Sequence, residues 1–242
     1  MPSDFSQSIN SSILSSSGRL ETASPKRSSR SQLNSFSLEQ LSCVLDRASQ
    51  EDYTVAIALL DRLIALCPDS AADYNHRGLM YYYNGQYSEA VKDLSQALKL
   101  DPNLDSAYNN RANCYAACGC LIEAIADYDL ALDLNPTNLC AWIDQGIAWR
   151  ELGIYDLALE NFDITLIIGE SLQERIYAER GRTYHLQGDW NCAVADYQTA
   201  LEILTDKTDK ANLKDRVENW LDKLLDPTMK GDRRADRSRL NK

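Results

Sequence analysis

Hydrophobic positions recur at helical spacing from Ser37 onward. The first run places Leu38, Leu41 and Leu45 on one helix face. It starts with the tetrapeptide SLEQ, which is typical of a helix N-terminus because the Ser37 hydroxyl can cap free backbone N–H groups. The later runs have the same spacing, and none shows the strict alternation of a strand. The pattern therefore predicts an all-α chain.

Prolines and glycines then recur at a fixed interval. The interval is 34 residues, with one of 35 before the last glycine; the residues are Pro68, Pro102 and Pro136, and Gly85, Gly119, Gly153 and Gly188. Such regularity indicates an internal repeat in which each copy contributes two helices. The predicted copies are repeat 1 to repeat 5, at 37–70, 71–104, 105–138, 139–173 and 174–204.

Side-chain size follows the same order in repeats 2 to 5. Each first helix has an aromatic residue, then a small residue, then a second aromatic, and each second helix has an alanine followed after four residues by a large side chain. The sets are Tyr74, Tyr108, Trp142 and Tyr177; Gly78, Ala112, Gly146 and Gly181; Tyr81, Tyr115, Trp149 and Tyr184; Ala90, Ala124, Ala158 and Ala193; and Leu94, Tyr128, Phe162 and Tyr197. This order resembles the tetratricopeptide repeat (TPR) family, whose pattern is W-x2-L-G-x2-Y, then A-x3-F, then Pro.

The resemblance covers residues 37 to about 204. It implies a right-handed superhelical solenoid of about five helix–turn–helix repeats. Repeat 4 departs from the pattern with Thr165 for Ala and Glu170 for Pro, so we expect an altered turn within residues 169–173.

A further helix should follow the last repeat. In the segment ANLKDRVENWLDKLL one stripe is apolar and the opposite side is charged; the stripe is Leu213, Val217, Trp220, Leu221 and Leu224. TPR arrays need such a helix to cover their last open surface. We therefore expect a capping helix within residues 205–225, and about eleven helices in all.

The two ends differ in composition from the repeats. Residues 1–36 contain 13 serines and little that could form a core, which predicts a disordered segment. The alternative is a plastid-type transit peptide, which would place the protein in the plastid stroma instead of the cytoplasm. The composition of residues 226–242 predicts a basic, flexible tail, which could bind an acidic partner or the surface of a membrane. No apolar run is long enough to span a bilayer, so a soluble protein is expected.

Charge is divided in the same way. The chain carries a net charge of -11, but residues 1–36 carry +2 and residues 226–242 carry +3, so the stretch between them carries -16. An acidic body of this kind argues against nucleic-acid binding, because phosphates attract clustered positive charge. A basic or amphipathic protein partner suits it better. The expected state is a monomer or a weak oligomer.

Three of the seven cysteines fall within seven residues. Cys114, Cys118 and Cys120 match no strong zinc spacing and have no fourth ligand nearby in sequence. The pattern favours small buried or half-buried thiols and no bound metal. A redox-sensitive pair of Cys118 and Cys120 stays open as the alternative.

Catalytic chemistry is not indicated. The chain has two histidines, and it has neither a Gly-rich phosphate loop nor an HExxH motif. Acidic residues such as Asp127, Asp129 and Asp196 are interpreted as charges on solvated helix faces. We expect no enzyme activity and no cofactor.

The resemblance to TPR proteins implies that the first helices line a concave groove for a partner peptide. The second, fifth, ninth and twelfth positions of these helices are expected to face it: Asn75, Leu79, Tyr82, Asn109, Asn113, Ala116, Ile143, Ile147, Arg150, Arg175, Ala178, Arg182 and His185. Asparagine can donate to and accept from a peptide backbone. Arginine can bind a carboxylate with two hydrogen bonds.

One family-specific function is not supported. TPR co-chaperones that hold the carboxylate of heat-shock chaperones use a fixed set of Lys, Asn and Arg, and no frame of these repeats restores it; in one frame the positions read Asn75, Leu79, Asn113, Cys140 and Asp144. The amino-acid sequence of the repeats resembles that of bacterial, especially cyanobacterial, TPR proteins, some of which assist assembly of photosynthetic complexes. The leading hypothesis is a protein-interaction scaffold or assembly adaptor. The alternative is a sensor whose groove responds to a ligand or to oxidation of Cys118 and Cys120.

Overall fold

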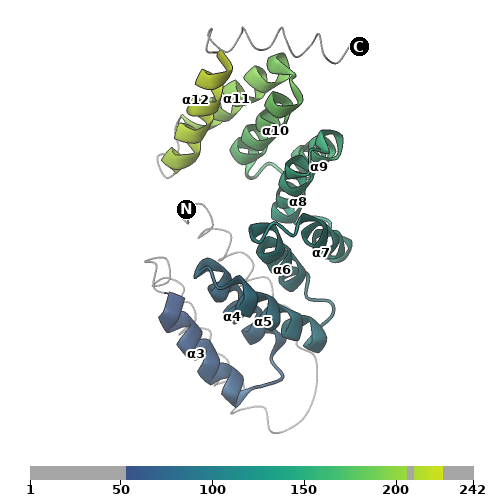
Figure 1. Ribbon diagram of the computed structural model, residues 1–242, viewed down its shortest axis with the longest axis vertical. Helices are drawn as coiled ribbons and strands as arrows, with labels where there is room; N and C mark the ends of the chain where they lie inside the picture. The colour runs from purple at the N-terminus through teal and green to yellow at the C-terminus, as the bar shows by residue number, and fades with distance from the viewer. Residues whose placement is uncertain (1–52, 206–209, 226–242) are drawn as a thin grey trace. The chain divides into compact units, whose positions relative to one another are not determined.

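The computed structural model describes residues 53–205 and 210–225, and this part of the chain consists of ten α-helices and no strands (Figure 1). The prediction of an all-α fold is confirmed. The predicted first helix of repeat 1 and the two end segments, 1–36 and 226–242, lie outside the described residues. The helices are α3 (Tyr53–Leu66), α4 (Ala71–Tyr83), α5 (Tyr87–Leu100), α6 (Asp105–Ala117), α7 (Leu121–Leu134), α8 (Leu139–Glu151), α9 (Tyr155–Ile168), α10 (Gln173–Gln187), α11 (Trp190–Leu204) and α12 (Ala211–Leu225).

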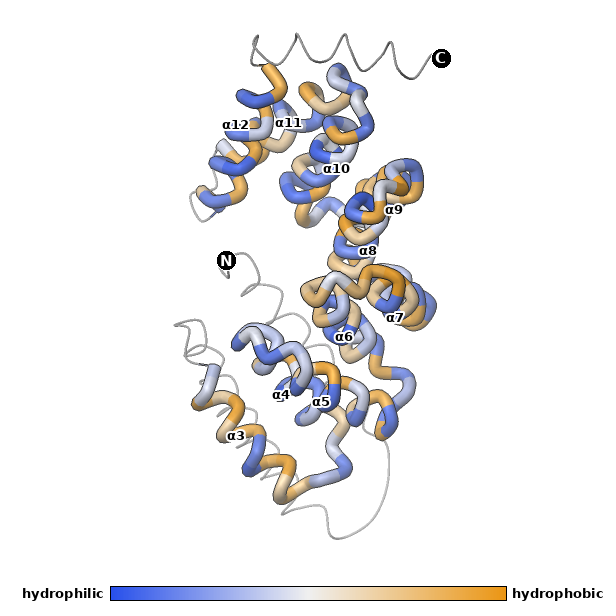
Figure 2. Tube along the Cα trace, in the orientation of Figure 1, coloured by the Kyte–Doolittle hydropathy of each residue, from blue (hydrophilic) through white to orange (hydrophobic). Residues whose placement is uncertain are grey.

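The helices form two bodies. The N-terminal body ends at Pro136 and contains α3 to α7, and the C-terminal body begins at Thr137 and contains α8 to α12. Within each body the two helices of a repeat pack together, and the second helix also packs on the first helix of the next repeat. Hydrophobic and hydrophilic residues are interspersed along the helices (Figure 2), because one side of a helix is buried and the other is exposed.

Small residues allow the paired helices to approach closely, as the sequence predicts. A Cβ atom added at Gly78 would lie 2.7 Å from Cγ of Leu94, and one added at Gly181 would lie 2.9 Å from Cδ1 of Tyr197. The second-helix alanines on the other side of these contacts are completely buried, at Ala90, Ala124, Ala158 and Ala193. The order of small and large positions in the sequence therefore corresponds to one packing contact that recurs at Gly78, Gly146 and Gly181.

The turn between repeats 4 and 5 is altered, also as predicted. Gly169 is extended, and Leu172 adopts the left-handed conformation with φ 63°, which among the described non-glycine residues is found only there. A Cβ atom at Gly169 would lie 2.8 Å from Cδ1 of Leu139, so a larger residue there would have to displace the end of that side chain. The turn lets α10 begin at Gln173 without the closing proline that the earlier repeats have.

The last helix covers the end of the C-terminal body. In α12, Leu213, Val217 and Leu224 are buried in one cluster with Tyr197 and Leu204 of α11. Trp220 and Leu221 pack against this cluster from the same helix and stay partly exposed. The apolar stripe read from the sequence is therefore the side of α12 that faces the repeats.

Candidate functional site

The first helices, which the sequence assigns to partner binding, contact one another within each body. In the N-terminal body α4 contacts α6, and in the C-terminal body α10 contacts both α8 and α12. Positions are numbered here from the first residue of each repeat, which is residue 71, 105, 139 or 174. The half-exposed side that these helices present is called the first-helix face.

The fifth position is buried in three of the four repeats and does not line a surface there. Ile143 is completely buried in a cluster with Phe162 and Ile176, so the expectation that it faces a partner is wrong. Asn75 is only 6% exposed: its Nδ2 donates to the Ser106 hydroxyl at 3.4 Å, and its Oδ1 accepts a bond from Asn110 at 3.0 Å. The third of these residues is Ala178, which is completely buried.

Asn109, the fifth-position residue of repeat 3, is different. It is half-buried, and its Oδ1 is a buried atom with no hydrogen-bond partner among the described residues. A buried amide oxygen without a donor is uncommon in folded proteins. Asn109 is therefore the fifth-position residue with an unused acceptor.

The ninth and twelfth positions are the ones that stay accessible. With the exception of Arg150, the side chains there are half-buried and form the first-helix face: Leu79, Tyr82, Asn113, Ala116, Ile147, Arg182 and His185. Tyr82 contacts the rings of Tyr83 and Tyr87, with centroids 5.4 and 5.7 Å apart. The face is uncharged in the N-terminal body and carries Arg182 and His185 in the C-terminal body.

Two tyrosines of the second helices reach this face through the core. Tyr128 is buried, and its hydroxyl donates to Oδ1 of Asn113 at 2.5 Å. Tyr197 is buried as well, and its hydroxyl lies 3.3 Å from Nδ1 of His185. Burial raises the pKa of Tyr197, so its hydroxyl keeps its proton. Because Tyr128 occupies the oxygen of Asn113, that side chain offers a partner its N–H groups.

Two of the expected carboxylate-binding arginines are already paired. Nη1 of Arg150 lies 2.6 Å from Oε2 of Glu179, and both side chains are more than nine-tenths buried. Arg175 pairs with Asp144 at 2.5 Å. Burial would raise the pKa of Glu179, but Arg150 and the other nearby arginines outweigh it and lower that pKa. Neither Arg150 nor Arg175 therefore offers a partner an unpaired guanidinium, which corrects the expectation for both.

The last helix adds charged and aromatic groups to the same side. Nη2 of Arg216 lies 3.3 Å from Oε1 of Glu179, and the Arg216 guanidinium lies 4.9 Å from the ring centroid of Trp220. The guanidinium of Arg182 lies 5.5 Å from the same ring centroid. At its start α12 is joined to α10 by an ion pair between Lys210 and Glu174. None of these contributions of α12 was expected from the sequence.

The repeats match known family models. One, described as tetratricopeptide repeat, matches residues 47–112, and another with the same description matches residues 106–138. The chain is a tetratricopeptide-repeat protein. No curated protein matches it.

Solved TPR structures are similar to this TPR chain in fold. TTC0263, a thermophilic TPR protein from Thermus thermophilus, is 18% identical with a TM-score of 0.66, covering 76% of this chain and 98% of its own. MamA is 23% identical with a TM-score of 0.58, covering 65% and 91%. YrrB, described as a TPR protein with an unusual peptide-binding site, is 20% identical with a TM-score of 0.54, covering 69% and 86%.

Each of three TPR repeats has a buried arginine–aspartate pair that the sequence interpretation missed. Nε and Nη2 of Arg111 donate to the two carboxylate oxygens of Asp127 at 2.7 and 2.8 Å, and Arg180 binds Asp196 in the same way at 2.7 and 2.8 Å. Arg77 and Asp93 form the third pair. The carboxylates are at most 8% exposed, so the interpretation of Asp127 and Asp196 as solvated charges is wrong.

These arginines also join one TPR repeat to the previous one. Arg77 bonds Asp61 of α3 at 2.7 Å, Arg111 bonds the Ser95 hydroxyl at 3.1 Å, and Arg180 bonds Asp163 at 2.6 Å. Each guanidinium also lies within 6.0 Å of two tyrosine rings of its own helix. The pairs therefore serve the packing of the array and not its surface.

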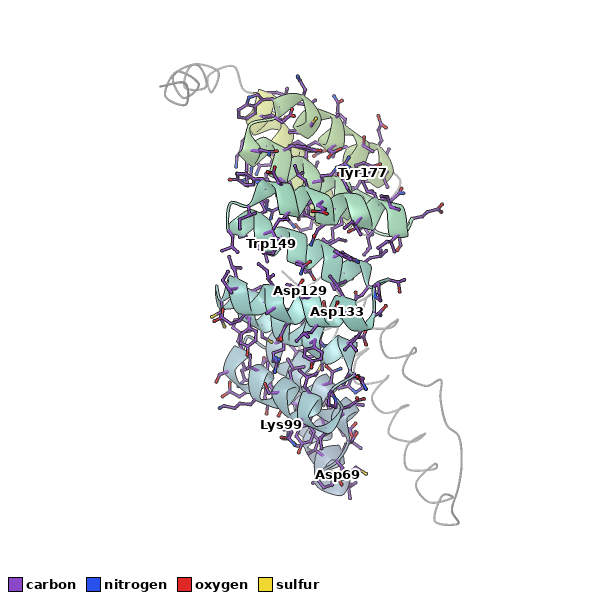
Figure 3. The ribbon with its side chains drawn as sticks, turned by 90° about the vertical axis from the view of Figure 1, so that its right-hand side faces the viewer. Asp69, Lys99, Asp129, Asp133, Trp149 and Tyr177 are labelled. Carbon is purple, nitrogen blue, oxygen red and sulfur yellow. The ribbon has the colours of Figure 1, made fainter. Side chains whose placement is uncertain are left out.

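The corresponding pair in repeat 4 is neutral. Nδ2 of Asn161 donates to Oε1 of Gln145 at 2.8 Å, and both side chains are buried. The spacing of 16 residues is the same, and both partners change together. This joint change is a signal in the sequence from which the buried pairs could have been predicted. Asp129, by contrast, is exposed as expected, and Figure 3 shows it with Asp133 on α7.

The cysteines of repeat 3 divide into two kinds. Cys114 is completely buried, and burial raises the pKa of its thiol to about 12. Cys118 and Cys120 are exposed at the turn on either side of Gly119, so the expectation of buried or half-buried thiols is wrong for these two. Among residues 53–205 and 210–225, no three His, Cys, Asp or Glu side chains form a group that could hold a metal ion. In the same residues no helix is long and apolar enough to cross a membrane.

Proposed function

We propose that this TPR protein is a non-enzymatic adaptor that binds a segment of a partner protein on its first-helix face. The observation that carries the proposal is the set of half-buried, uncharged side chains at Leu79, Tyr82, Asn113 and Ala116 of the N-terminal body. The arginines of α4 and α6, Arg77 and Arg111, are instead paired with buried aspartates of the second helices. The description of YrrB as peptide-binding supports the same use of the fold.

The arrangement suits an extended segment. Leu79 and Tyr82 supply apolar contact, and Tyr82 belongs to a cluster of tyrosine rings that bury area with few rotatable bonds. The Asn113 amide, fixed by Tyr128, donates to a backbone carbonyl of the segment. Fixing the donor before binding lowers the entropy that binding costs.

The test changes the face without disturbing the core. Replacing Asn113 alone would leave the buried Tyr128 hydroxyl without its acceptor, so the test variant is Asn113→Ile with Tyr128→Phe. Repeat 4 has this combination naturally, as Ile147 and Phe162. Tyr128→Phe alone is the matched control, because it removes the hydroxyl and keeps the amide.

Peptides selected on the wild-type full chain from a random display library serve as ligands. We expect the double variant to bind them about fivefold more weakly and the control to bind them within a factor of two, since one hydrogen bond to a desolvated backbone group contributes about 1 kcal/mol. Equal affinity of all three proteins in calorimetry would contradict binding at this face.

The cellular role is proposed at a coarser level. An adaptor of this kind would hold a protein subunit during assembly of a multiprotein complex, act in the cytoplasm, and not bind nucleic acid. The acidic repeats support a protein partner over a phosphate backbone. The assembly role would be supported if the full chain co-migrated with a subunit that is not yet part of its complex and did not co-migrate with the finished complex.

A redox-sensing role is the second candidate, and the exposure of Cys118 and Cys120 favours it. The two thiols lie two residues apart at the end of α6, the helix that carries Asn113. A disulfide between them would strain this turn and could move the end of the helix. The test is a mass-shift assay for reversible oxidation together with peptide affinity in both states. Unchanged affinity after oxidation would reject this role.

A further inference from the structure

We infer that the C-terminal body binds an acidic segment of the partner through Arg182 and Arg216, and that α12 supplies half of the site. The inference rests on the proposed function, and it gives the partner a chemical class. Its starting point is the buried carboxylate of Glu179 on α10, which Arg150 of α8 and Arg216 of α12 both contact, together with Arg182 of α10, which lies near the same Trp220 ring as Arg216.

Glu179 carries the central carboxylate, and Arg150 and Arg216 contact it at different distances. Arg150 makes the short contact at 2.6 Å and also lies 3.4 Å from the Glu179 backbone oxygen. Arg216 reaches the other carboxylate oxygen at 3.3 Å, and its side chain is 45% exposed. Glu179 is thus satisfied by Arg150, while Arg216 makes a longer contact and remains open to solvent.

Arg182 hydrogen-bonds the side chain of Tyr197 but has no ion pair among the described residues. Its guanidinium lies near the ring of Trp220, at 5.5 Å from the centroid, and the guanidinium of Arg216 lies 4.9 Å from that centroid. Two guanidiniums therefore lie near the ring of Trp220, and neither is fully neutralised by a carboxylate. Arginine stacked on an aromatic ring stays charged and keeps its N–H groups at the edge, where they can bind a carboxylate.

Trp220 is itself held in place. Its ring lies 6.0 Å from the ring of the buried Tyr197 and packs against the cluster formed by α11 and α12. The positions of both arginines are therefore set before a ligand arrives, which reduces the entropy lost on binding. The fixed part of the site comes from Trp220 and Arg216 of α12, the helix that also covers the end of the array.

Charge complementarity identifies the occupant as acidic. The chain as a whole carries a net charge of -11, so a pair of incompletely neutralised arginines is a local exception. Aspartate and glutamate side chains bind such guanidiniums with two parallel hydrogen bonds. A basic segment would be repelled at this place and attracted elsewhere on the acidic surface.

The test uses the full chain and a random peptide display library. Peptides selected on the wild type should be enriched in Asp and Glu, and the variant Arg182→Gln with Arg216→Gln should bind them about tenfold more weakly. The matched control is Lys223→Gln, which removes an exposed positive charge from the next turn of α12 and keeps both Arg182 and Arg216. It should bind the peptides within a factor of two, and thermal unfolding should show that both variants are folded.

The outcomes separate this inference from the proposed function. Selected peptides without acidic enrichment, or acidic peptides that bind the Arg182/Arg216 variant as tightly as the wild type, would overturn the inference and leave the adaptor function standing. Failure to select any peptide above background on the wild type would overturn both. Acidic enrichment that disappears with the double variant but not with Lys223→Gln would support the acidic site.

Discussion

The N-terminal and C-terminal bodies both join neighbouring first helices through polar side chains, but with different chemistry. In the N-terminal body Asn75 bonds Asn110 and Ser106, so α4 and α6 are joined by neutral hydrogen bonds. In the C-terminal body the contacts are ion pairs, between Arg150 and Glu179 and between Arg175 and Asp144. One repeat geometry therefore accepts two kinds of polar contact.

The difference has consequences for stability and for binding. A neutral hydrogen bond can lose a partner at a cost of about 1 kcal/mol, whereas a buried ion pair leaves an uncompensated charge when one partner is removed. The two bodies also differ at the surface: the first-helix face is uncharged in the N-terminal body and basic in the C-terminal body. Four predictions test this contrast, beginning with the largest expected effect.

Removal of α12 should affect the C-terminal body most. A chain that ends at Thr205 exposes the cluster around Tyr197, Ala200 and Leu204, and it loses Lys210 and Arg216, which pair with Glu174 and Glu179. Exposed apolar surface of this kind promotes association. We expect self-association in analytical ultracentrifugation. A monomeric truncated chain with an unchanged melting temperature would show that α12 has no covering role.

Breaking one buried ion pair should cost more than breaking an exposed one. Arg150→Ala leaves Glu179 buried without its short contact, so we expect the free energy of unfolding to fall by about 3 kcal/mol. Arg216→Ala removes the longer contact to the same carboxylate and should cost about 1 kcal/mol or less, because Arg216 is 45% exposed. Urea denaturation followed by circular dichroism measures both. Equal losses would mean that burial does not decide the value of these pairs.

The pair of repeat 3 can be converted to the chemistry of repeat 4. Arg111→Ala should lower the free energy of unfolding by about 3 kcal/mol, because Asp127 is buried. The double variant Arg111→Gln with Asp127→Asn copies Gln145 and Asn161 and should lose about 1 kcal/mol or less. A double variant as unstable as the single one would show that the neutral pair depends on features peculiar to repeat 4.

A smaller effect should appear with pH at His76. Burial lowers the pKa of this histidine, with Asp73 opposing, and its Nδ1 is a buried atom without a hydrogen-bond partner among the described residues. Protonation therefore favours the unfolded chain. The stability from a neutral His76 is complete above about pH 6.5 and is lost as the pH falls below that value.

The variant His76→Asn isolates this term, because repeat 3 has Asn110 at the same position. Its free energy of unfolding should change less than that of the wild type between neutral and mildly acidic pH. Parallel pH profiles for the two proteins would show that His76 does not titrate differently on folding.

The sequence was sufficient for the packing but not for the polar contacts. The contact of Gly78 with Leu94 and its counterparts at Gly146 and Gly181 could be predicted, because the size and apolar character of the side chains decide them and the sequence repeats the pattern. The Asp127 carboxylate could not be placed by its own helix pattern, since its burial depends on Arg111 on another helix. In repeat 4 both partners change together, to Gln145 and Asn161, and this joint change is the sign in the sequence that the two positions are in contact.

The candidate face could be predicted only in part for a similar reason. The ninth and twelfth positions of the first helices stay accessible, but Ile143 at the fifth position is buried by the neighbouring first helix. Arg150 is drawn inward by Glu179, a contact between residues 29 positions apart. Trp220 and Arg216 were assigned to a covering helix because an apolar stripe does not reveal which groups at its border meet the repeats.

The most direct test of the account is hydrogen–deuterium exchange of the full chain with and without a display-selected peptide. The account predicts that the peptide slows exchange in the first helices, chiefly α4 and α6, and in α10 and α12 if the peptide is acidic. The second helices α5, α7, α9 and α11 should change much less. Protection confined to the second helices would contradict binding at the first-helix face.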